Sequence, residues 1–85
     1  MTFNLLYKVG KNKMYKTYTR GEYGEVLRSF KELKERAANK NFKMISHAGG
    51  NMGVELCYTD GKQYVYLLVC TENERKMWWL GRIAN

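Results

Sequence analysis

The strongest constraint on the fold is an apolar stripe at helical spacing in residues 22–39. Steps of three and four residues place its members on one face of a helix. They are Tyr23, Val26, Leu27, Phe30, Leu33 and Ala37. The opposite face mixes glutamates with lysines and arginines, and pairs such as Glu32 and Arg36 stand four residues apart, which favours a solvated helix surface. This helix needs a second apolar layer to cover, and the segments around it supply one.

The first twenty residues predict a β-hairpin. Apolar residues alternate with polar ones up to Val9, Gly10 to Asn12 interrupt the pattern, and residues 13–20 resume it with β-favouring tyrosines and threonines. A loop of odd length centred on Lys11 sets Tyr7 opposite Tyr15. This register places three bases and one tyrosine together on the face away from the core: Lys8, Lys16, Arg20 and Tyr18.

Three further strands are predicted over residues 42–47, 53–59 and 63–71. A glycine cluster at 49–50 separates the first two. Asp60-Gly61 separates the last two and predicts a tight hairpin with Thr59 opposite Lys62. Residues 65–70 are apolar on both sides of the strand, which predicts a central position in the sheet.

Residues 72–84 fit either a C-terminal helix or a sixth strand. Thr71 to Glu74 match a helix-capping box, and Met77, Leu80 and Ile83 share a helical face. Trp78-Trp79-Leu80 favours a strand instead, and Gly81 weakens a helix.

The expected fold is therefore α+β, with a mainly antiparallel sheet of about five strands in the order ββαβββ and one amphipathic helix packed on it. With 85 residues, the chain has room for one compact domain spanning residues 1–85. Multi-domain enzymes and long repeat arrays are excluded by this length.

The charge is strongly basic and unevenly distributed. Fifteen lysines and arginines face eight acids, giving a net charge of +7. Residues 1–20 hold five bases and no acid, whereas residues 44–85 are balanced. Because the excess falls on the predicted hairpin, we expect a polyanionic partner there, although surplus lysine also serves solubility and protects edge strands.

The leading hypothesis is a small, non-enzymatic binding module that contacts nucleic acid with low sequence specificity. Tyr18 is expected to stack on an unpaired base, and Lys43 to extend the basic surface. The residues expected to contact phosphate are Lys8, Lys11, Lys13, Lys16 and Arg20.

Two alternatives remain open. The first is a protein-interaction module of a phage or mobile element, in which the same basic face, or an exposed Trp78 or Trp79, holds an acidic partner such as a nucleic-acid-processing enzyme. The second is a small ribonuclease that uses His47, beside the Gly49 to Gly53 loop, as its base. A glycine cluster between strands is more often a simple hairpin turn.

No cofactor or metal is expected. Two cysteines and one histidine lack the number and spacing of zinc ligands, and Cys57 and Cys70 are expected to pack in the core without a disulfide. No apolar run approaches the roughly 20 residues that span a bilayer, and no signal peptide is recognised, so a cytoplasmic location is expected. The oligomeric state stays open.

Overall fold

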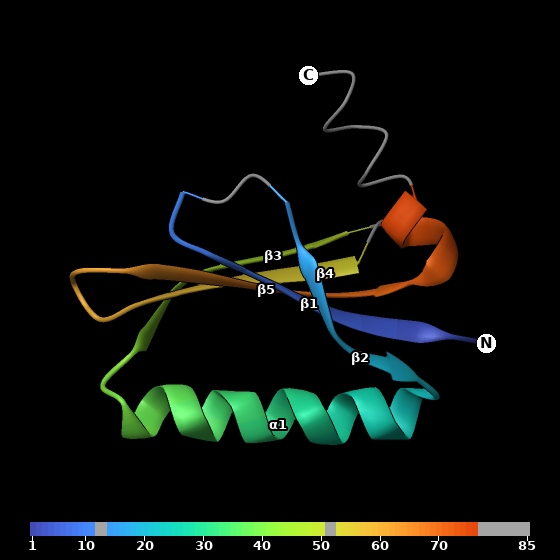
Figure 1. Cartoon of the computed structure of the whole chain (residues 1–85), viewed down its shortest axis with the longest axis horizontal. Coiled ribbons are helices and arrows are strands. Elements are labelled where there is room, and N and C mark those ends of the chain that lie inside the picture. The colour runs from blue at the N-terminus through green and yellow to red at the C-terminus, as the bar shows by residue number, and fades with distance from the viewer. Residues whose placement is uncertain (12–13, 51–52, 77–85) are drawn as a thin grey trace.

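The computed structural model describes residues 1–11, 14–50 and 53–76. Its elements follow the predicted order ββαβββ (Figure 1). The strands are β1 (Phe3–Val9), β2 (Lys16–Gly21), β3 (Lys43–Gly50), β4 (Gly53–Thr59) and β5 (Tyr64–Thr71), and α1 is Tyr23–Asn39. Residues 72–76 form a short additional helix. The α+β fold class is confirmed.

The five strands form one sheet in the order β2-β1-β5-β4-β3, with every neighbouring pair antiparallel. The predicted central position of the last strand is correct, since β5 lies between β1 and β4. Strands β2 and β3 form the two edges. All of the residues from Lys43 to Gly49 in β3 are exposed.

The single long helix covers one face of the sheet, below it in Figure 1. Val26 is buried on this face against Leu5, Leu56, Tyr58 and Leu67 from three strands. Phe30, Leu33 and Ala37 continue the apolar stripe at the edge of this cluster. The stripe predicted from the sequence is therefore the side of α1 that forms the main core.

A Schellman motif ends α1. Asn41 takes a left-handed conformation with φ 64°, which asparagine tolerates better than most residues. The Asn41 N–H donates to the Ala38 carbonyl at 3.1 Å, and the Phe42 N–H donates to the Ala37 carbonyl at 2.8 Å. These bonds turn the chain sharply and set Phe42 against the end of the helix.

A smaller core lies on the other face of the sheet. Leu6, Leu68 and Cys70 are buried there, and Tyr15 from the loop between β1 and β2 packs on them. Side chains alternate between the two faces of a strand, so Leu5 and Leu6 serve different cores. The short helix at 72–76 lies on this side, opposite α1 (Figure 1).

The predicted register of the first hairpin is wrong. Tyr7 pairs with Lys16 rather than Tyr15, and a bulge between Leu5 and Leu6 shifts the far end so that Leu5 pairs with Thr19. The prediction assumed continuous pairing, whereas the bulge inserts one extra residue into β2. Because β2 is an edge strand, Lys16 reaches water even on the face that carries Tyr7.

The turn between β4 and β5 is longer than predicted. Thr59 pairs with Tyr64, so Cys57 lies opposite Tyr66. The Asp60 carboxylate accepts hydrogen bonds from the backbone N–H groups of Lys62 and Gln63, both at 2.9 Å. This side-chain-closed turn replaces the two-residue turn that Asp-Gly suggests.

The C-terminal helix begins with the predicted capping box. The Glu74 N–H donates to Thr71 Oγ1 at 3.2 Å, and the Thr71 N–H donates to Glu74 Oε1 at 2.7 Å. The remainder of the segment, including Trp78 and Trp79, lies outside the described residues. Among the described helices, none is long and apolar enough to cross a membrane.

Candidate functional site

The bulged hairpin does not present its bases on one face. Lys8 lies on the face away from α1, where its Nζ is 4.5 Å from the ring centroid of Tyr66 and 4.9 Å from that of Tyr15. Lys16 lies on the opposite face, because it pairs with Tyr7. The single basic surface predicted for the hairpin is therefore split.

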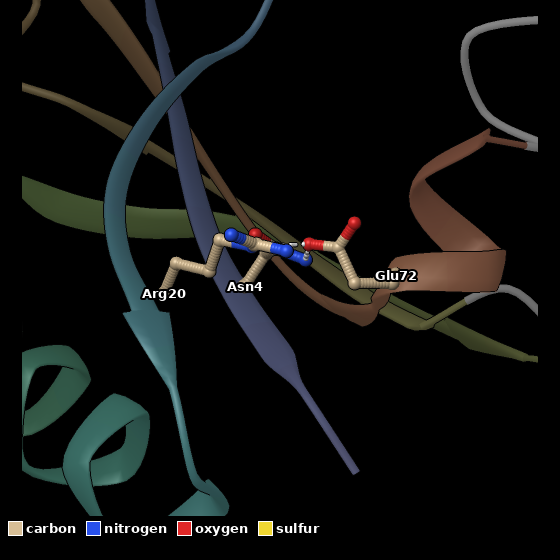
Figure 2. A network of polar contacts seen from close by, with 3 residues as sticks. All are labelled: Asn4, Arg20 and Glu72. Carbon is tan, nitrogen blue, oxygen red and sulfur yellow. Dashed lines mark hydrogen bonds and ion pairs between the residues drawn. The ribbon is translucent and has the colours of Figure 1, made fainter.

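Arg20 is held by an acid rather than left open. Its Nε donates to Glu72 Oε1 at 2.7 Å, and Asn4 Nδ2 donates to the same oxygen at 2.8 Å (Figure 2). The hydrogen bonds from Asn4 and Arg20 lower the pKa of Glu72. Asn4 is fully buried, and this cluster joins β1, β2 and the C-terminal helix, with the Nε of Arg20 engaged by Glu72.

The other predicted residues lie apart from one another. Tyr18 is 41% exposed, and its ring meets the edge of Tyr7 at a centroid distance of 6.2 Å. Lys43 begins β3, at the opposite edge of the sheet from β2. Lys11 is exposed in the hairpin loop, and Lys13 lies outside the described residues.

The topology gathers a different set of bases at one end of the sheet. Three connections begin at this end, on the left of Figure 1: β1 to β2, α1 to β3, and β4 to β5. The Gly10 N–H donates to the Tyr64 carbonyl, and Lys43 pairs with Thr59, which fixes this arrangement. We name the exposed cations of these connections and their flanks the basic end. They are Lys11, Lys16, Arg36, Lys40, Lys43 and Lys62.

Nothing in the described chain neutralises the basic end by direct pairing. None of its six cations forms an ion pair with a described residue. Asp60 is the one acid in the described parts of the three connections. Hydrogen bonds from the backbone N–H groups of Gln63 and Lys62 lower its pKa, and the charge of Lys62 lowers it further by a smaller amount. The basic end therefore carries positive charge on side chains that form no ion pair with a described residue.

An apolar groove of about 430 Å³ opens at the basic end, between the last turns of α1 and the start of β5. Four of the lining residues carry polar side-chain groups: Arg36, Lys40, Tyr58 and Gln63. The apolar part of the lining includes Val9, Leu33, Ala37, Phe42, Val65 and Leu67. A ligand with an apolar body and a negative charge matches this combination.

The other predicted sites show no catalytic or metal-binding arrangement in the described chain. His47 is exposed on β3, and its imidazole makes no side-chain hydrogen bond with a described residue. Burial raises the pKa of the Cys70 thiol to about 11, and both cysteines are free and buried. No group of three metal-ligating side chains occurs among residues 1–11, 14–50 and 53–76.

Sequence reasoning missed three members of the basic end: Arg36, Lys40 and Lys62. These residues fall in segments whose net charge is close to zero, so the charge of each segment does not reveal them. Following the alternating direction of the strands would have placed all three connections at the same end. The chain matches no protein-family model, and neither a curated protein nor a solved structure is detectably similar to it.

Proposed function

We propose that this domain binds nucleic acid by contacting backbone phosphates with its basic end. The observation that carries the proposal is that three connections at one end of the sheet, with their flanks, hold six exposed cations, none of them in an ion pair with a described residue. Phosphate contacts by lysine and arginine supply most of the affinity of non-specific nucleic-acid binding. They do not carry sequence information, so low sequence specificity is expected.

The proposal replaces the hairpin face with a surface made by the whole fold. Arg20 is no longer among the residues proposed to contact phosphate, because it forms an ion pair with Glu72. Lys8 is also omitted, because it is half-buried between two tyrosine rings. Lys43 stays, since its strand begins at the same end of the sheet as the β4–β5 turn.

Binding should depend steeply on salt, because each neutralised phosphate releases condensed counterions. Six contacts predict a slope of roughly −4 to −5 for log affinity against log salt concentration. Fluorescence anisotropy with labelled single-stranded DNA, duplex DNA and duplex RNA over a salt series measures this slope. No binding at low salt to any of the three would refute the proposal.

A charge-matched pair of variants tests the location. Replacing Lys40, Lys43 and Lys62 with glutamine removes three charges from the basic end, and we expect the slope to fall by about 2 to 3. The control replaces Arg28, Lys31 and Lys76 with glutamine. These residues are exposed outside the basic end, so the control should bind with the affinity and salt slope of the unmodified protein. Equal losses in the two variants would show that only total charge matters.

A second candidate function, binding of a protein partner, is favoured by the outer edge of β3. Among the described strands it pairs only with β4, and its residues Met44 and Ile45 are 53% and 55% exposed. Such an edge accepts an extended segment by strand addition, and Lys43 favours an acidic one. A pull-down after nuclease treatment tests this function. A protein partner that the unmodified domain retains and Ile45→Glu loses supports it. A partner that the unmodified domain and Ile45→Glu both retain excludes β3 as the contact.

A further inference from the structure

We infer that the apolar groove at the basic end receives one unpaired nucleobase, so that the nucleic acid bound there is single-stranded. This inference rests on the proposed function and narrows its ligand. It is drawn from the lining of the groove, the rigidity of its rim and the charges that flank it.

The groove has the size and chemistry of a base-binding site. Its volume of about 430 Å³ falls within the range of small-ligand pockets, about 300 to 1,000 Å³. Phe42 contributes an aromatic side chain to the lining, and aromatic side chains can stack on a base. Gln63 also lines the groove, and a glutamine amide can both donate and accept hydrogen bonds, as the edge of a base requires.

The rim beside the groove is fixed by the end of α1. The left-handed Asn41 and the bond from the Phe42 N–H to the Ala37 carbonyl hold Lys40 and Phe42 on either side of one turn. The backbone that carries the Phe42 ring and the Lys40 side chain is thus fixed before any ligand arrives. A site that needs little reorganisation loses less affinity to ordering its own groups.

Charge distinguishes this groove from an ordinary packing gap. Arg36 and Lys40 are exposed in its lining, and neither pairs with a described acid. The phosphates on either side of an inserted base would neutralise them. A duplex keeps its bases stacked inside, so it would reach these two cations but leave the groove empty.

A second groove provides an internal comparison. It has about 170 Å³ and lies beside the first half of α1, between Tyr23, Phe30, Val54 and Val69. Its lining contains no charged side chain. It therefore lacks the flanking cations on which the inference depends, and it serves as the control site.

The test compares groove-filling variants on three oligonucleotides: a single strand, a strand of the same length in which every position is abasic, and the matching duplex. Ala37→Phe fills the larger groove without changing charge, and Val54→Phe fills the smaller one. We expect the unmodified protein and Val54→Phe to bind the single strand with an affinity on the order of tenfold higher than that for the abasic strand or the duplex, which is the effect of stacking one base. Ala37→Phe should lose that preference while keeping its affinity for the duplex.

A spectroscopic measurement keeps the test decisive even if Ala37→Phe does not fold. The fluorescent base 2-aminopurine is quenched by its neighbours in a single strand, so its emission should rise when the unmodified protein unstacks it. Equal affinity for all three oligonucleotides, or unchanged emission on binding, overturns the inference and leaves phosphate binding intact. Absence of binding to every oligonucleotide overturns the proposed function itself.

Discussion

The phenol of Tyr15 donates a hydrogen bond to the carboxylate of Glu55, which joins the loop after β1 to strand β4 across the face opposite α1. Tyr15 also packs on Leu6, Leu68 and Cys70. The loop that carries Lys11 is thereby held over the second core. One consequence is that the position of part of the basic end depends on a contact made to a distant strand.

Tyr15→Phe should reduce the free energy of unfolding by about 1 to 2 kcal/mol, because a partly buried carboxylate loses a hydrogen-bond donor. Urea denaturation measures the loss. In a double-mutant cycle with Glu55→Ala, which removes the acceptor, the two losses should not add. Simple additivity would show that the two side chains do not interact in solution.

Stability should fall in acid partly through Glu72. Its pKa is lowered in the folded protein by hydrogen bonds from Asn4 and Arg20, so its contribution is complete above the ordinary value of 4.5. That contribution disappears as the pH falls through the lowered pKa, when the carboxylate is protonated. Unfolding measured from pH 6 to pH 3 should show a shallower acid dependence for Glu72→Gln. Glu35→Gln, at an exposed helix position, is the control and should retain the slope of the unmodified protein.

Gly53→Ala should be strongly destabilising. A Cβ at this position would lie 2.4 Å from the carbonyl oxygen of Val69, and the residue has a φ of 106°. We expect a loss of about 2 to 4 kcal/mol from the clash and the strained backbone together. Gly10→Ala provides the control, since its φ is 63° but nothing lies near the added carbon. Its cost should be about 1 to 2 kcal/mol, and similar losses in both variants would contradict the role of the contact with Val69.

Cys70 should resist alkylation in the folded protein. Burial raises its pKa to about 11, so the reactive thiolate is scarce at pH 8 as well as covered. Iodoacetamide labelling followed by peptide mass spectrometry should find Cys70 unmodified until denaturant is added. Rapid labelling under native conditions would show that the second core opens readily.

The fold could be predicted from sequence to the level of its elements. The helical stripe from Tyr23 to Ala37 and the apolar run of β5 are local periodic signals, and burial on one or both faces produces them directly. The register could not be predicted, because the bulge after Thr17 changes which residues pair without changing which are apolar.

The candidate site was only partly predictable for a related reason. The excess charge identified Lys11, Lys16 and Lys43, but Arg20 looked equally available in the sequence and is paired with Glu72 in the fold. Lys40 and Lys62 are part of the candidate site only because the directions of the strands place their two connections at the same end of the sheet. Sequence distance conceals this kind of proximity, since the three connections are brought together only when the sheet forms.

The placement of β5 between β1 and β4 also bears on how the chain acquires its structure during synthesis. The central strand is the last of the five to be translated, and its pairing with β1 joins segments about sixty residues apart. Until residues 64–71 leave the ribosome, β1 and β4 each lack a neighbour. We therefore expect folding to wait for β5 and to be governed by slow long-range closure, with one side of β1 and one side of β4 open to mispairing until residues 64–71 arrive.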